Sequence, residues 1–373
     1  MPLESPSALK NPRYPILDAL RFILAFWVVM DHFGVFPLFA GAEATSVMGH
    51  TLPRIWGSFV YGVPAVMGFF VISGFCIHLP FRHGENLLVG PYYARRYIRI
   101  LVPVFAAIAI HRLAGSRAPL LGQNTVLWVG VLWSLLCEEI YYAVYPVLRF
   151  LRMRLGWPLL LSSTMALAVI TSSIRRYPSW TGYGPLRTAL ILLPVWLLGC
   201  HLAEISDQLP SIQSPYTIWG WRFLAWAGSW VCETLNFQAG IPYTQTMLWF
   251  GILAYFWLRK EIAYGANHKP LALFASAGAW SYSLYLMHIP AWDILQKFHV
   301  PNLGYISDWC LTAGFLLGVS YLFYLVIERP SHKLARRFQP TGIRQPAPKT
   351  LSATAPDSGF AAPVSLPSGE GET

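Results

Sequence analysis

Three ionisable residues of the first apolar segment, residues 15–36, share one face of the helix that this segment predicts. Arg21 and His32 are eleven residues apart, so they project from one face, about 16 Å apart along the axis. Asp18 precedes Arg21 by three residues and joins that face. An imidazole can act as general base or nucleophile, and a guanidinium binds anions. Two interpretations remain: a track in which Arg21 holds an anionic substrate for His32, or an Asp18–Arg21 ion pair that stabilises packing.

Two consecutive carboxyl groups, Glu138 and Glu139, lie inside another apolar segment, residues 125–148. Glu138 follows Ser134 by four residues, so both project from one helix face. A buried carboxyl group can orient an imidazole or accept a proton. We therefore expect Glu138 to be a catalytic residue and Ser134 to support it, with an ion pair to an arginine of another segment as the structural alternative.

A serine among glycines, Ser73, lies near the end of the second apolar segment, residues 55–79. Glycine and serine let transmembrane helices approach closely. Ser73 is therefore a candidate supporting residue, and helix packing is an equally good explanation of it.

Three arginines precede the third apolar segment, residues 97–113, or lie at its start: Arg95, Arg96 and Arg99. Guanidinium groups bind phosphate oxygens in pairs. Arg96 and Arg99 are therefore candidates for binding a phosphorylated co-substrate. The alternative is that they only set the orientation of the chain in a membrane.

The composition of the chain indicates whether these residues lie in a membrane protein or in a soluble one. Of 373 residues, 55% are hydrophobic and 12% are charged, and the mean hydropathy is +0.45. Soluble domains are about 45–50% apolar and about 25% charged. These values exclude a disordered chain and favour a polytopic membrane protein over a soluble enzyme. Five widely spaced cysteines without a CxxC pair suggest neither a disulfide framework nor a metal site.

Apolar runs long enough to cross a bilayer predict an all-α bundle of about ten spans. A helix needs about 20 apolar residues to cross. The runs cover residues 15–36, 55–79, 97–113, 125–148, 157–174, 186–203, 216–234, 241–258, 271–291 and 305–327. The seventh run is uncertain because Arg222 interrupts it.

The basic residues predict that both termini are cytoplasmic. With that orientation the inner segments hold 18 of the 27 Lys and Arg residues, and the outer loops hold seven, as the positive-inside rule expects. The net charge of +10 is then explained by the orientation of the chain in the membrane. Nucleic acid is therefore not an expected partner. Residues 1–14 form a cytoplasmic segment without a cleavable signal, and the Pro- and Ser-rich tail, residues 338–373, is expected to be disordered.

Six stretches, in this order, resemble the integral-membrane acyltransferase-3 family, whose members O-acylate surface polysaccharides, other glycans and secondary metabolites. One departure is Val66-Met67-Gly68 before the Phe-Phe pair, where that family often has an acidic or polar residue. The six stretches are LDALRFILAFWVVMDHF with Arg21 and His32, FFVISGF with Ser73, the Arg96/Arg99 pair, WSLLCEEIYY with Glu138, SYSLYLMHIP, and Glu328-Arg329-Pro330.

The resemblance implies a membrane acyltransferase domain over residues 15–337, located in the inner (cytoplasmic) membrane. It implies acyl-CoA as co-substrate, with acetyl-CoA the first expectation, and no permanently bound cofactor. The CoA phosphates would bind Arg96, Arg99 and Arg21. His32 would act as general base or carry the acyl group, and Glu138 would fix the tautomer of its imidazole.

The resemblance also implies an acceptor on the outer side, a hydroxyl of a surface or exported carbohydrate or glycolipid. Aromatic residues that could stack on sugar rings, or equally form an interfacial belt, are Trp219, Trp221, Trp226 and Trp230. Expected partners are the lipid bilayer and the acceptor, and the resemblance allows polysaccharide-assembly proteins as well.

Two alternative functions remain open at the level of sequence. One is an acyltransferase that acts on a small secondary metabolite or a lipid head group. The other is a transporter or flippase, in which Arg21 and Glu138 line a permeation path without acyl chemistry. Consumption of an acyl thioester would distinguish the enzyme from the transporter.

Overall fold

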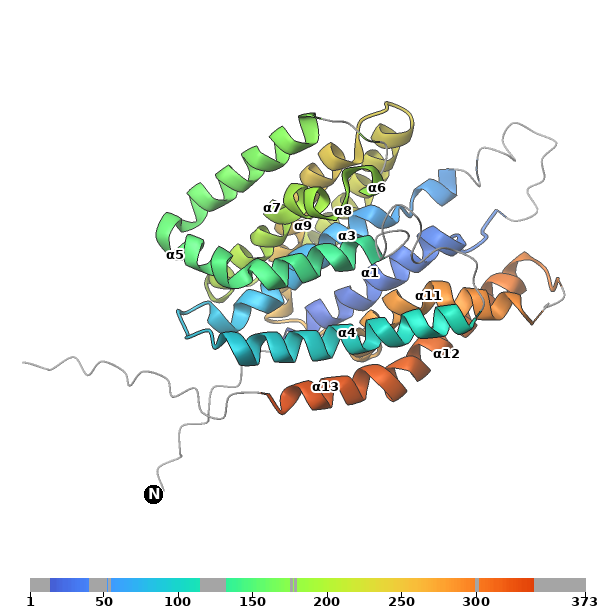
Figure 1. Cartoon of the computed structure of the whole chain (residues 1–373). Helices are drawn as coiled ribbons and strands as arrows, with labels where there is room; N and C mark the ends of the chain where they lie inside the picture. Colours follow the sequence, from blue (N-terminus) through green and yellow to red (C-terminus); the bar gives the residue numbers. More distant parts are fainter. Residues whose placement is uncertain are drawn as a thin grey trace, which may run out of the picture. The chain divides into compact units, whose positions relative to one another are not determined.

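Helices make up all the regular structure in the part of the chain that the computed structural model describes, which is residues 14–39, 52, 55–114, 132–174, 177, 180–298 and 302–338 (Figure 1). The predicted N-terminal segment and tail lie outside these residues, apart from Tyr14 and Phe338. The helices are α1 (Pro15–Phe33), α3 (Gly62–His78), α4 (Val89–Leu113), α5 (Leu132–Ile174), α6 (Trp180–Tyr183), α7 (Pro185–Ile205), α8 (Pro215–Phe237), α9 (Tyr243–Gly265), α10 (Ala272–Ala277), α11 (Ser281–Gln296), α12 (Tyr305–Phe323) and α13 (Arg329–Arg336).

The predicted apolar segments coincide with these helices, including the two that fall on α5. Gly156 has φ 73° inside α5, a conformation that glycine adopts without a steric penalty. α5 therefore consists of two arms, residues 132–155 and 157–174, which Figure 1 shows diverging from a bend. These arms match the predicted segments 125–148 and 157–174, although residues 125–131 lie outside the described part.

Four helical stretches of the described residues are long and apolar enough to cross a membrane: 55–81, 132–174, 185–208 and 305–336. The expected count of about ten spans is therefore not confirmed. The physical reason is that the other helices contain charged and polar residues or, like α11 with 16 residues, are short. α1 carries Asp18, Arg21 and Asp31, and α9 carries an Arg-Lys-Glu run, so neither is uniformly apolar.

α3 and α7 pack backbone to backbone through two glycines. A Cβ atom on Gly74 would lie 2.0 Å from the carbonyl oxygen of Trp196, and one on Gly199 would lie 2.0 Å from that of Val71. Only glycine therefore permits this approach. The packing role expected for this small-residue stretch is confirmed at Gly74, and it fixes the adjacent Ser73 against α7.

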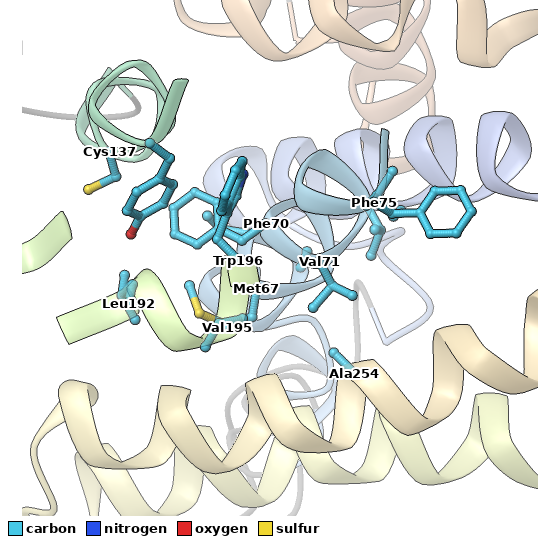
Figure 2. Close-up of a cluster of buried hydrophobic side chains, with 14 of the residues drawn as sticks. Met67, Phe70, Val71, Phe75, Cys137, Leu192, Val195, Trp196 and Ala254 are labelled. Carbon is cyan, nitrogen blue, oxygen red and sulfur yellow. The ribbon is translucent and has the colours of Figure 1, made fainter. Parts of the chain in front are cut away.

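The core beside this contact is aromatic and fully buried. Phe70 of α3 and Trp196 of α7 are both 0% exposed, and Figure 2 labels both in one buried cluster with Cys137 of α5. Tyr141 packs between these helices, with its ring centroid 5.7 Å from that of Phe70 and 5.5 Å from that of Trp196. This core holds α3, the first arm of α5 and α7 in a fixed arrangement around Ser73 and Glu138.

α8 and α9 are joined by an ion pair that explains the interruption of the seventh predicted segment. The guanidinium of Arg222 donates to both carboxylate oxygens of Glu261, at 2.7 and 3.0 Å. Glu261 is 0% exposed and also accepts from the indole of Trp257 at 2.9 Å. Arg222 therefore has a buried structural partner.

Candidate active site

A cavity of about 200 Å³ lies between α1, α3, α4, the first arm of α5 and α11, and the stretch 324–336 closes it on one side. Cationic side chains and carboxylates gather in its wall together with serine hydroxyls and aromatic rings. The polar residues in the wall are Arg21, Ser73, Arg96, Arg99, Ser134, Glu138, Tyr142, Ser281, Tyr282, Tyr285, Glu328 and His332.

Six of the eight residues proposed from the sequence line this one cavity, although they come from four helices. They are Arg21, Ser73, Arg96, Arg99, Ser134 and Glu138. The other two, Asp18 and His32, are not among its lining residues. The backbone of Asp18 instead packs against Gly278, where an added Cβ would lie 2.1 Å from the Asp18 carbonyl oxygen.

Hydroxyl groups line the cavity together with the Glu138 side chain. The Ser73 and Tyr142 hydroxyls lie 2.7 Å apart. The indole of Trp196 donates to the Ser73 hydroxyl at 3.2 Å. Arg96 lies over the Tyr142 ring, 6.0 Å from its centroid, so a guanidinium and a carboxyl group face the same space.

A second chain of polar contacts forms the wall next to the arginines. Arg99 donates from Nε to Nε2 of His332 at 3.1 Å, and that nitrogen lies 3.4 Å from Glu328. Glu328 is 1% exposed and accepts from the backbone N–H of Ser283 at 3.1 Å. Sequence reasoning missed His332. The sequence feature that could have revealed it is its position four residues after Glu328, because that spacing places both side chains on one helix face.

The arginine end of the cavity continues into a basic pocket of about 260 Å³ between α4 and α13. Arg96, Arg99 and His332 line both spaces, and Arg95 and Arg336 are added here. No acidic side chain is among the described residues that line it. This pocket can therefore bind a strongly anionic group, since guanidinium groups pair with phosphate oxygens.

His32 lies at the far end of α1, and its exposed side chain has a defined tautomer. Its Nδ1 lies 2.8 Å from the carbonyl oxygen of Val28. A carbonyl can only accept, so Nδ1 carries a proton and Nε2 of the neutral ring carries the lone pair. The expectation that Glu138 fixes this tautomer is wrong, because the carbonyl one helical turn earlier makes that bond.

A series of ring contacts joins His32 to the cavity. The His32 and His288 ring centroids are 5.1 Å apart, and those of His288 and Tyr285 are 6.0 Å apart. Tyr285 lines the cavity, and its hydroxyl lies 2.7 Å from that of Ser134. Tyr285 and His288 both belong to α11, and both are buried.

The four tryptophans suggested as an acceptor surface form two separate groups along α8. Trp219 and Trp221 lie beside cations, with Arg222 over the first ring at 5.0 Å and Lys260 over the second at 5.9 Å. Trp226 and Trp230 instead pack on Phe59, with ring centroids at 4.8 and 5.8 Å. A single aromatic surface for one sugar is therefore not present among these residues.

A comparison with known protein families identifies the family of this chain. A family model described as an acyltransferase domain, Acyl_transf_3, matches residues 14–325 and includes every residue that the sequence proposed for the site. No curated protein and no solved structure gave a match. Because the family match covers most of the chain, this protein belongs to the acyltransferase-3 family and is a membrane acyltransferase.

Proposed function

We propose that this protein transfers an acyl group, in the first instance acetyl, from cytoplasmic acyl-CoA to a hydroxyl of a surface or exported carbohydrate. The main support for the proposal is the cavity. Guanidinium groups lie at one end of it. At the other end, ring contacts join it to the His32 imidazole. An extended donor with an anionic head and a reactive thioester end matches that distribution of groups.

The basic pocket is suited to the phosphates of the donor. Arg95, Arg96, Arg99 and Arg336 line it, and each guanidinium can form paired hydrogen bonds with phosphate oxygens. The pantetheine arm would extend from there into the cavity past Glu138, whose carboxyl group can accept from an amide N–H. The thioester would then reach the Ser134–Tyr285 end.

His32 is the proposed general base. Its Nε2 lone pair takes the proton of the acceptor hydroxyl, whose oxygen attacks the thioester carbon and forms the new C–O bond. The C–S bond breaks, and the CoA thiolate takes a proton from the imidazolium to leave as the thiol. One proton passes through one imidazole, so the steps balance.

The proposed position of the acceptor is a pocket lined by Phe33, whose ring centroid lies 6.4 Å from that of His32. It is about 300 Å³ in volume and lies between α1, α11 and α12. Its wall combines the aromatic rings of Phe33, Trp292 and Trp309 with the Asp308 carboxylate. Rings that stack on a sugar face and a carboxylate that accepts from hydroxyls are suited to a carbohydrate. Phe33 follows His32 directly, and its ring centroid lies 4.9 Å from that of Trp292.

The proposed placement in the inner membrane follows from the position of the basic pocket at one end of the cavity. The basic pocket would face the cytoplasm, where acyl-CoA is made, and both chain termini would lie on that side. About ten helical segments would then cross the bilayer. Helices with interior charges, such as α1 and α9, would cross because their charged groups face the bundle rather than lipid.

The experiment that tests the donor site measures acetyl transfer by the purified protein in nanodiscs with varied acetyl-CoA. We expect Arg96→Ala and Arg99→Ala each to raise the KM for acetyl-CoA about tenfold or more, because each removes charge-assisted hydrogen bonds. Arg154→Ala, at an exposed position, is the matched control and should leave the KM unchanged. An unchanged KM in Arg96→Ala and Arg99→Ala would contradict the donor site.

A further inference from the structure

One buried imidazole beside His32 has a nitrogen without a partner in the part of the chain that the structure describes. His288 is 0% exposed, and its Nδ1 donates to the carbonyl oxygen of Tyr285 at 2.7 Å. Its Nε2 has no hydrogen-bond partner among the residues that the structure describes. An unpaired buried acceptor lowers stability, so its presence points to a bond that forms at some other stage.

The neighbouring ring cannot supply that bond in the resting state. The His32 and His288 ring centroids are 5.1 Å apart, and each ring donates its Nδ1 proton to a carbonyl of its own helix. Each neutral ring therefore presents a lone pair at Nε2. Two acceptors lie side by side, and a single additional proton would let one donate to the other.

Two further aromatic rings lie near His288. The Phe33 ring lies edge-on with its centroid at 6.0 Å, and the Tyr285 ring has its centroid at the same distance. In such surroundings a hydrogen bond from a charged donor is stronger than it would be in water. The proton that the proposed reaction delivers to His32 would meet a buried acceptor at Nε2 of His288.

We propose that His288 is a positioning residue for His32, which holds the imidazolium by accepting a hydrogen bond at its Nε2. This inference rests on the proposed function. The acceptor hydroxyl gives its proton to Nε2 of His32, and the N–H so formed donates to His288. The same proton then passes to the CoA thiolate when the C–S bond has broken, which returns both rings to their resting state.

Three substitutions separate this role from a purely structural one. His288→Asn places an amide N–H near the position of Nδ1, so it can keep the bond to the Tyr285 carbonyl but has no group at Nε2. His288→Gln carries its carbonyl farther out and can supply an acceptor there. His288→Phe fills the space of the ring and supplies neither group.

We expect His288→Asn and His288→Phe to lower kcat about tenfold or more, with the KM for acetyl-CoA within about twofold of wild type. His288→Gln should retain clearly more of the wild-type kcat than His288→Asn. A structural role through the Tyr285 carbonyl demands the opposite order. A kcat in His288→Asn that equals or exceeds that of His288→Gln would overturn the proposal, and so would a wild-type kcat in His288→Phe.

A matched control and the wild-type rate keep the two proposals distinguishable. In His268, as in His288, Nδ1 lies within hydrogen-bond distance of a nearby backbone carbonyl oxygen, that of Tyr264 at 3.2 Å. His268 is not among the residues that line the cavity. His268→Asn should transfer acetyl at the wild-type rate. If the wild-type protein transfers no acetyl group, the proposed function fails. If only the order of the His288 variants differs from expectation, the role of His288 fails and the function stands.

Discussion

At the scale of single residues, a charged side chain inside an apolar helix is accommodated when a neighbouring helix supplies an oppositely charged partner. Arg222 and Glu261 pair across α8 and α9 with two hydrogen bonds. Taking two charges out of water is costly, and removing one partner leaves that cost uncompensated. The pair therefore fixes how α8 lies on α9, although it need not contribute to net stability.

We predict that Arg222→Met lowers the free energy of unfolding by roughly 3 kcal/mol or more, since Glu261 is then buried without its cation. The double variant Arg222→Met/Glu261→Met should recover most of that loss. Thermal unfolding in detergent measures both effects. Arg154→Met, at an exposed position, should match wild type. An equally unstable double variant would show that the pair itself stabilises the protein.

Part of the site could be predicted from residue types and spacing alone. Glu138 and Ser134 share a helix face by a spacing of four residues, and they line one cavity. The contact between His32 and His288 joins residues 256 positions apart in the chain, on α1 and α11. No local pattern encodes such a contact, and the backbone acceptor at Val28 carries no sequence signal either.

At the scale of elements, the glycine contact between α3 and α7 determines where the cavity wall lies. Ser73 and Gly74 are neighbours on α3, so one face of this short stretch packs on α7 while the other lines the cavity. Any increase in the distance between α3 and α7 would therefore move Ser73 away from the Trp196 indole that donates to it.

Gly199→Ala should destabilise the protein by at least about 1–3 kcal/mol, the usual cost of forcing extra atoms into a packed core. The new Cβ would lie 2.0 Å from the Val71 carbonyl oxygen. Acetyl transfer should fall as well, because Ser73 is displaced. The control is Gly220→Ala in α8, where nothing lies within 4 Å of an added Cβ, and it should be as stable as wild type or more so.

The extent of α5 shows what sequence can and cannot predict about elements. The apolar pattern predicted two segments, 125–148 and 157–174, and Gly156 between them has the positive φ that separates the two arms. The pattern could not predict the direction in which the second arm leaves the bend. That direction depends on the backbone conformation of Gly156, which no apolar pattern encodes.

At the scale of the whole molecule, composition predicted a membrane protein, but it could not decide which helices cross. Four helical stretches of the described residues are apolar enough on their own. Others carry charges that the bundle accommodates, as Arg21 does in the cavity and Glu261 does beside Arg222. A hydropathy pattern describes each helix on its own, so it cannot distinguish a charged side chain that faces lipid from one that faces a cavity.

The proposed orientation predicts which loops are reached from outside the cell. In a Cys310→Ser background, which removes an exposed thiol, Asn302→Cys should react with a membrane-impermeant maleimide on intact cells. Asn86→Cys, exposed in the loop between α3 and α4, should react only after permeabilisation. The reverse labelling would place the basic pocket outside, where acyl-CoA is not available.

The most direct test of the account is thiol release from acetyl-CoA by the purified protein in nanodiscs, measured together with transfer of the labelled acetyl group to added carbohydrate. We expect both signals to appear at equal rates. Both should fall at least about a thousandfold in His32→Ala, which removes the proposed base, and persist in His268→Ala. Full thiol release and transfer by a correctly inserted His32→Ala protein would contradict the account.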